Sequence, residues 1–168
     1  MKHLHLLRHA KSSWDDPDLP DSERPLNKRG RRAAKTMARH MRDEGVAPQL
    51  VLCSPALRTR QTLERIEPAL GKRLVQVEPS LYGAGVGVLL EHVRAVPETI
   101  DSVLVIGHNP GLQDLAVGLA RPGPATQELA AKFPTAALAT LAFRGRWADL
   151  DAGGAELVGY VRPRDLER

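Results

Sequence analysis

The chain has 168 residues, of which 42% are hydrophobic, 26% charged and only 4% aromatic, as in a soluble globular protein whose core is built from Leu, Val and Ala. The formal charge of +4 favours anionic partners, but the arginines are dispersed and no basic run is interleaved with aromatic residues, which argues against nucleic acid. A lone Cys53, no apolar run of membrane-spanning length and no signal-peptide pattern lead us to expect one cytoplasmic domain over residues 1–168, without a membrane partner.

Apolar runs bounded by turn residues predict the strands of a sheet. The first run begins at His3 and ends abruptly at the Arg8-His9 pair, as expected for a buried strand of a parallel sheet. Further strands are predicted over residues 49–53, 74–77, 102–107, 136–143 and 157–161.

Apolar residues at helical spacing predict helices between these strands, over residues 28–44, 54–70, 85–96, 109–119 and 125–131. Asn27 is expected to cap the first of them, and Ser54 the second, with Pro55 at its first helical position. Residues 15–24 are polar and contain two prolines, which is typical of a loop. The alternation of strands and helices predicts a three-layer α/β/α domain with a mostly parallel central sheet.

Three of the predicted strands end in similar polar junctions. Arg8-His9 follows the first strand, residues 54–58 follow the second, and His108-Asn109 follow the fourth. Because the carboxyl ends of parallel strands share one edge of the sheet, these residues should meet in one cleft. Two helix starts would direct unpaired N–H groups to the same place, where Arg58 lies in a first turn. The sequence therefore predicts an electropositive pocket that suits a tetrahedral dianion.

The Arg8-His9 pair indicates what this pocket could do. A permanent cation beside His9 disfavours the imidazolium form and lowers the pKa of the ring, so that one nitrogen stays nucleophilic near neutral pH. Arg8 can hold an oxyanion against that nitrogen with its guanidinium fork. Lys11 and Asn109 are further candidates to bind phosphate. The pair therefore predicts attack on a phosphoryl group.

Three segments, residues 7–11 (LRHAK), 54–62 (SPALRTRQT) and 105–110 (VIGHNP), resemble the signatures of the histidine phosphatase superfamily. The short chain, with no room for a large cap insertion, and residues 21–26 (DSERPL) and 133–137 (FPTAA) are most similar to phosphohistidine phosphatases of the SixA type. The resemblance implies that His9 becomes phosphorylated, that Arg8, Arg58 and His108 complete the phosphate pocket, and that no metal or organic cofactor is needed.

The proton donor is less clear, because the glutamate that serves many relatives has no clear counterpart near residues 80–83. Either Asp15 supplies the proton, with Asp16 and Asp18 as alternatives, or the leaving group needs little help. The second option fits phosphohistidine, since imidazole leaves more readily than an alkoxide. We therefore expect hydrolysis of phosphohistidine on a protein domain, by a monomeric enzyme.

Three alternatives remain open. The first is a phosphomonoesterase for small sugar or nucleotide phosphates, and the second is a module that binds a phosphorylated ligand without turnover. The third is a zinc site that combines His9 and His108 with His3 and His5. Arg8 and Arg58 argue against zinc, because they would repel a cation.

Overall fold

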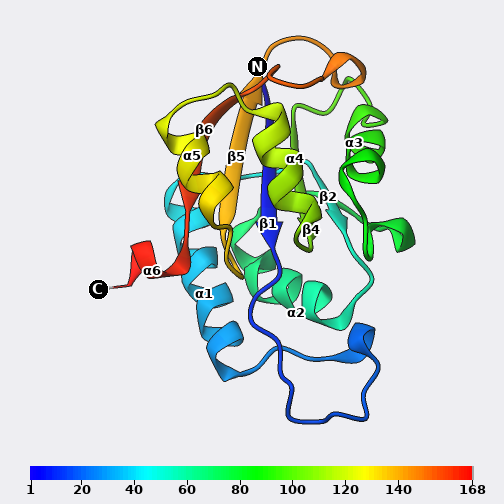
Figure 1. The fold of residues 1–168 in the computed structure, drawn as a ribbon, viewed down its shortest axis with the longest axis vertical. Coiled ribbons are helices and arrows are strands. Elements are labelled where there is room, and N and C mark those ends of the chain that lie inside the picture. The colour runs from blue at the N-terminus through cyan, green and yellow to red at the C-terminus, as the bar shows by residue number, and fades with distance from the viewer. Residues whose placement is uncertain (168) are drawn as a thin grey trace.

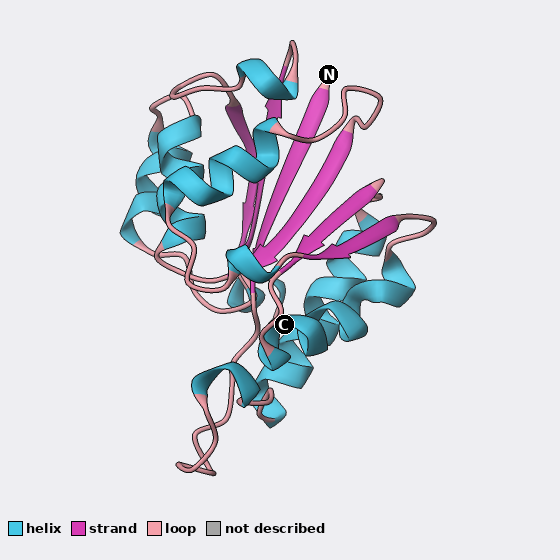
Figure 2. Ribbon diagram, turned by 90° about the vertical axis from the view of Figure 1, so that its right-hand side faces the viewer, coloured by secondary structure: helices cyan, strands magenta, loops and turns pink. Residues whose placement is uncertain are grey.

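The computed structural model describes residues 1–167 and contains one six-stranded sheet with helices on both faces (Figures 1 and 2). The strands are β1 (Lys2–Arg8), β2 (Leu50–Cys53), β3 (Leu74–Val77), β4 (Ser102–Gly107), β5 (Leu138–Phe143) and β6 (Glu156–Val161). Their order is β3-β2-β4-β1-β5-β6. Only β5 runs antiparallel to its neighbours, so the predicted three-layer, mostly parallel α/β fold is confirmed.

Helices cover both faces of this sheet. One face carries α1 (Lys28–Asp43), α2 (Leu57–Ile66) and the short α6 (Pro163–Leu166), and the other carries α3 (Val86–Arg94), α4 (Gly111–Leu119) and α5 (Pro124–Ala131). None of the helices in the described part of the chain combines the length and hydropathy that a bilayer span requires.

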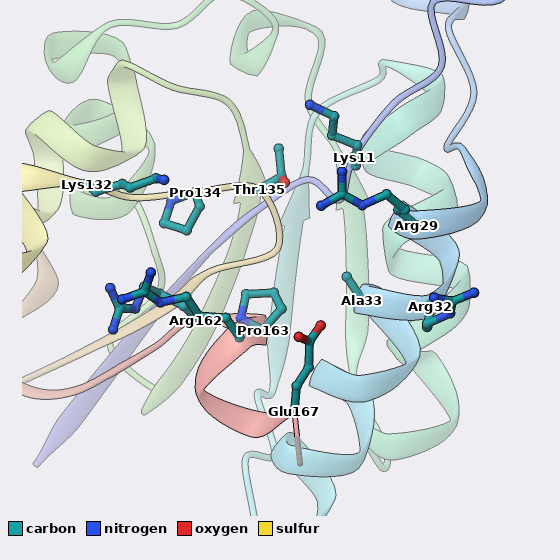
Figure 3. A pocket seen from close by; sticks show the side chains of 11 residues that line it. Lys11, Arg29, Arg32, Ala33, Lys132, Pro134, Thr135, Arg162, Pro163 and Glu167 are labelled. Atoms are coloured by element: carbon teal, nitrogen blue, oxygen red, sulfur yellow. The ribbon is translucent and has the colours of Figure 1, made fainter.

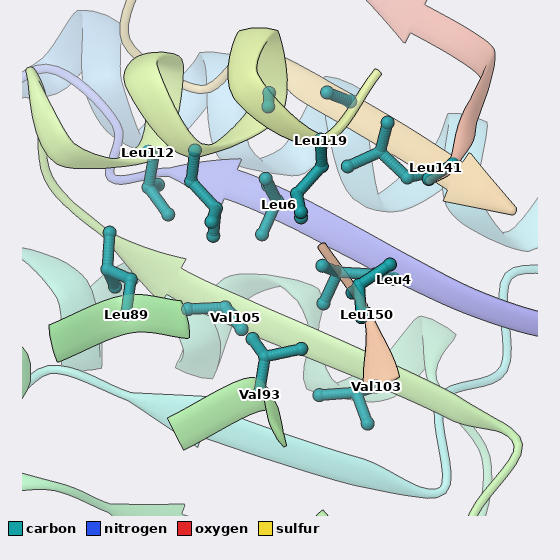
Figure 4. Packing of buried hydrophobic residues seen from close by; sticks show 14 of the residues in the cluster. Leu4, Leu6, Leu89, Val93, Val103, Val105, Leu112, Leu119, Leu141 and Leu150 are labelled. Atoms are coloured by element: carbon teal, nitrogen blue, oxygen red, sulfur yellow. The ribbon is translucent and has the colours of Figure 1, made fainter. Parts of the chain in front are cut away.

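The core consists of two apolar layers, one on each side of the sheet. In the larger layer, Leu4 and Leu6 of β1 and Val103 and Val105 of β4 pack against α3 and α4 (Figure 4). Leu7 points to the other face and joins the layer beneath α1 and α2, as the period-2 alternation of a strand requires. Because β1 is buried on both faces, the backbone that leads to Arg8 and His9 is rigidly held.

Most predicted elements agree with the structure, with local corrections. The Asn27 side chain accepts a hydrogen bond from the Gly30 N–H at 2.8 Å, as predicted for a helix cap. The second helix begins later than predicted, at Leu57 after Ala56, and Ser54 does not cap it. The last predicted turn of that helix is a 3-10 segment over Glu67–Ala69. Strand β5 begins at Leu138 rather than at residue 136, because Ala136 has a positive φ of 62° that a strand cannot contain.

Candidate active site

The three polar junctions meet at one edge of the sheet, as predicted. Arg8 at the end of β1 lies in register with Gly107 of β4, and Cys53 at the end of β2 lies in register with Ile106. The pocket at this edge has a volume of about 270 Å³. Its lining includes the predicted Arg8, His9, Arg58, His108, Lys11 and Asn109, together with Ser12, Trp14, Arg24 and Thr135.

His9 is buried, with 8% of its surface exposed. Its Nδ1 lies 2.7 Å from the backbone oxygen of Ala10. A carbonyl oxygen can only accept, so Nδ1 carries the proton and Nε2 keeps its lone pair. Burial lowers the pKa of His9 to about 3, against the opposing effect of the bond to Ala10. Electrostatic effects of His108, Arg58 and Arg8 lower it further, in that order, but they rank below burial. The neighbouring cation therefore lowers the pKa of His9, as predicted from the sequence, but burial is the larger cause.

The backbone beside His9 is held from two sides. The His9 N–H donates to the Gly107 oxygen of β4 at 3.1 Å. The Ala10 N–H donates to Thr62 Oγ1 at 3.0 Å, and the Thr62 hydroxyl in turn donates to the Arg58 oxygen at 2.7 Å. Since Ala10 also accepts the bond from the imidazole, α2 determines the orientation of the ring through Thr62.

The β1–α1 loop is packed closely against the start of α1. A Cβ added to Gly30 would lie 2.1 Å from the Lys11 oxygen, so only glycine allows this approach. Lys11 itself is exposed and lies at the rim of the pocket.

The Arg8 guanidinium is fixed by a bond from Nη1 to the Phe133 oxygen at 3.1 Å. Its Nε is buried and has no hydrogen-bond partner within residues 1–167. Burial, and then the charge of Arg58, hold the pKa of Arg8 below its ordinary value. Two partly desolvated cations that repel each other are stabilised when an anion lies between them, which favours phosphate binding here.

His108 stands beside His9, with 5.3 Å between the ring centroids. Its Nε2 is 2.7 Å from Ser54 Oγ, whereas its buried Nδ1 has no partner in the described part of the chain. Burial, followed by the charge of Arg58, lowers the pKa of His108 to about 4. Ser54, which we predicted to cap a helix, thus orients this imidazole instead.

An unpredicted residue, Asp21, holds Arg58 in place. Arg58 donates from Nη1 to the Asp21 backbone oxygen at 2.7 Å and from Nη2 to its carboxylate at 2.9 Å. The carboxylate also accepts bonds from the Tyr82 hydroxyl and from Arg24. These bonds, led by the one from Tyr82, hold the pKa of Asp21 well below its usual range. In the sequence, Asp21 belongs to the 21–26 block, which resembles the SixA type but does not by itself indicate a contact with Arg58.

The structure does not bring the predicted proton donor into the pocket. Asp15, Asp16 and Asp18 are all exposed and do not line it. The loop turns back instead so that Asp21 contacts Arg58 without lining the pocket itself. The low pKa of this carboxylate keeps it ionised, and it is therefore a poor acid. Within residues 1–167, no Asp or Glu side chain lines the pocket.

Two further predictions concern Asn109 and zinc. Asn109 donates through Nδ2 to the Phe133 oxygen at 3.0 Å, so its amide holds the pocket wall.

His3 and His5 line a different pocket, of about 600 Å³, that His9 and His108 do not line. Within residues 1–167, no cluster of three or more His, Cys, Asp or Glu side chains is arranged to hold a metal ion. The four-histidine alternative is therefore wrong.

Comparison with known proteins agrees with this geometry. Residues 4–95 match the model of the histidine phosphatase superfamily (branch 1). Phosphohistidine phosphatase SixA of Escherichia coli (strain K12) is 34% identical over 139 residues, which cover 81% of this chain and 82% of that protein. An uncharacterized Mycobacterium tuberculosis protein, Rv1276c, is 37% identical over 162 residues, covering 94% of this chain and all of its own.

Solved structures give the same result. A candidate SixA phosphohistidine phosphatase from Nakamurella multipartitia superposes with a TM-score of 0.86 at 35% identity, covering 96% of each chain. The protein histidine phosphatase SixA complexed with tungstate superposes with a TM-score of 0.81 at 28% identity, covering 98% of this chain and 99% of its own. The chain belongs to the histidine phosphatase superfamily and is a phosphatase of the SixA type.

Proposed function

We propose that this phosphatase hydrolyses phosphohistidine on a protein substrate, with His9 as the nucleophile that is transiently phosphorylated. One observation carries the proposal: the bond from His9 Nδ1 to the Ala10 oxygen leaves Nε2 unprotonated beside two arginines and a second histidine. A neutral imidazole nitrogen in an electropositive pocket is suited to attack on phosphorus.

In the proposed first step, His9 Nε2 forms a bond to phosphorus while the substrate's own P–N bond breaks in line. Arg8 and Arg58 hold the equatorial oxygens with their charged guanidinium groups, and the neutral His108 donates a hydrogen bond to them. The departing imidazole leaves in its neutral form when its other ring nitrogen carries a proton, so the enzyme need not supply one. Water then attacks this phosphorus and the P–N bond to His9 breaks. The proton that the water loses passes to an oxygen of the released phosphate, so His9 returns to its neutral form.

The pocket lining, which holds no carboxylic acid among the described residues, favours phosphohistidine over alkyl phosphate esters. An alkoxide leaving group must be protonated as it departs, whereas Asp21 is ionised and the three predicted aspartates are exposed. The observed pocket therefore supports a substrate with a good leaving group. A phosphomonoesterase for small metabolites is the competing function.

Intact-mass and phosphate-release measurements on a phosphohistidine carrier domain, beside a panel of sugar and nucleotide phosphates, test the proposal. Wild-type protein should release phosphate fastest from the carrier and trap an acid-labile phosphoryl label. The His9→Asn variant should lose both. Retained turnover in this variant would remove His9 from its role, and faster turnover of a metabolite would favour the competing function. Stoichiometric binding without phosphate release would indicate a non-catalytic module.

We further propose that the enzyme acts as a monomer in the cytoplasm. Cys53 is fully buried, and burial raises the pKa of its thiol to about 12, which fits an inert thiol in a reducing compartment.

A further inference from the structure

A second pocket, of about 250 Å³, lies directly beside the candidate active site. Lys11 and Thr135 line both pockets, so the two are adjacent. The walls of the second pocket come from the β1–α1 loop, the first turns of α1, the α5–β5 loop and the C-terminal segment around α6 (Figure 3). We call it the basic pocket, after its six cationic lining residues, Lys11, Arg29, Arg32, Lys132, Arg162 and Arg164.

The charges of the basic pocket are poorly balanced. Glu167 is the one acidic residue among those that line it. Arg162 is paired with Asp165 at 2.9 Å, but the other five cations make no ion pair with a carboxylate of residues 1–167. Cations gathered in a concave site repel one another and concentrate anions there. The basic pocket is therefore suited to an anionic ligand.

The arrangement of these cations indicates an extended ligand with several charges. They surround the pocket from four separate segments, and Pro134, Pro163 and Ala33 supply apolar wall between them. Figure 3 shows Glu167 extending from the end of α6 towards Ala33, so the space already accommodates a carboxylate. Dispersed cations on a partly apolar wall match carboxylates spaced along a peptide better than one compact ion.

We propose that the basic pocket binds an acidic segment of the phosphorylated protein on which this phosphatase acts. This inference rests on the proposed function and names the feature by which the substrate is recognised. Because Lys11 and Thr135 belong to both pockets, a segment bound here lies next to the phosphoryl group over His9. Binding in the basic pocket lowers KM for an acidic phosphoprotein and leaves small phosphate esters unaffected.

Two double variants of α1 form a matched test. Arg29→Gln with Arg32→Gln removes two cations that line the basic pocket, whereas Lys35→Gln with Arg39→Gln removes two exposed cations of the same helix that do not line it. The net charge of both variants is the same. Thermal denaturation of each protein establishes that it is folded.

Direct binding is measured with a hexaglutamate peptide by calorimetry, with the contacted amides identified by NMR. We expect binding to the wild type, about fivefold weaker binding to the Arg29/Arg32 variant, and less than a twofold change in the control, since each exposed ion pair contributes a small free energy. Binding should also weaken as salt increases. With an acidic phosphohistidine carrier as substrate, the KM of the Arg29/Arg32 variant should rise about fivefold while kcat stays constant. Its turnover of p-nitrophenyl phosphate should stay the same as that of the wild type.

Absence of hexaglutamate binding, or equal weakening in both variants, would overturn the inference. So would binding of pyrophosphate at the basic pocket without binding of the peptide, because the pocket would then take a small anion. If the peptide binds there but the wild type does not hydrolyse the carrier, the proposed function fails and the preference for an acidic ligand stands. The two failures are thus distinguishable.

Discussion

The Thr62 hydroxyl supports the backbone beside His9. Thr62 is fully buried, accepts the Ala10 N–H at 3.0 Å and donates to the Arg58 oxygen at 2.7 Å. Thr62→Val preserves the shape of the side chain but leaves the Ala10 N–H buried without a partner. Because the Ala10 oxygen holds the His9 ring, the variant should affect both stability and catalysis.

The cost of Thr62→Val is that of one unsatisfied buried donor, about 1–3 kcal/mol. At about 2–4 °C per kcal/mol for a protein of this size, the melting temperature should fall by roughly 4–8 °C for a central loss of about 2 kcal/mol. A loosened imidazole spends less time aligned for attack, so kcat/KM should fall about tenfold.

Calorimetry gives the melting temperature, and turnover of p-nitrophenyl phosphate gives kcat/KM. Thr62→Ser is the matched control, because it keeps the hydroxyl and should retain most of the activity. A Thr62→Val protein with wild-type melting temperature and activity would refute the argument that this hydroxyl positions His9.

Gly30→Ala should destabilise the protein by about 1–3 kcal/mol in urea denaturation, because the new Cβ would overlap a backbone carbonyl of the β1–α1 loop. Gly118→Ala in α4, where nothing lies within 4 Å of the added Cβ, should instead stabilise the protein by up to about 1 kcal/mol. A change in the free energy of unfolding that has the same sign in both variants would contradict this reasoning. Because Asp21 positions Arg58, Asp21→Asn should lower kcat/KM about fivefold on phosphohistidine and on aryl phosphate alike. A decrease in kcat/KM that is confined to the aryl ester would instead identify Asp21 as an acid. His9 has a pKa of about 3 in the folded protein, against an ordinary value of 6.5. Below pH 6.5 the unfolded chain takes up a proton at His9 that the folded protein does not, so the free energy of unfolding falls as the pH falls. At pH 5 this loss is about 2 kcal/mol. Urea denaturation at pH 7 and pH 5 should show a smaller loss for His9→Asn than for the wild type, and equal losses would count against a neutral, buried imidazole.

The low pKa of His9 gives the pocket its chemistry at neutral pH. An ordinary histidine is partly protonated near pH 6.5, whereas burial keeps this ring neutral. The charges of Arg58 and Arg8 act in the same direction as burial, and the same two guanidinium groups are available to bind phosphate. Burial is thus the main cause of the neutral ring, and the arginines add to it.

Much of the fold could be predicted because the signals are local. An apolar run that ends at Arg8-His9, and further runs that alternate with amphipathic helices, are enough to predict parallel strands with their carboxyl ends at one edge. That topology brings His9, Arg58 and His108 together, whatever the details of the loops. The strand and helix ends were less accurate, since the start of β5 depends on the positive φ of Ala136, which the apolar pattern does not reveal.

The sequence by itself determined the α/β architecture and the residues that gather at its edge, because periodicity and polar strand ends are properties of short segments. Only the tertiary structure decided that Asp21 rather than Asp15 contacts Arg58, that Ser54 contacts His108, and that residues from both ends of the chain form the basic pocket. The physical reason is that a long loop can close in many ways. Its path is set by hydrogen bonds and ion pairs to distant residues, such as those between Asp21 and Arg58, which no local pattern encodes.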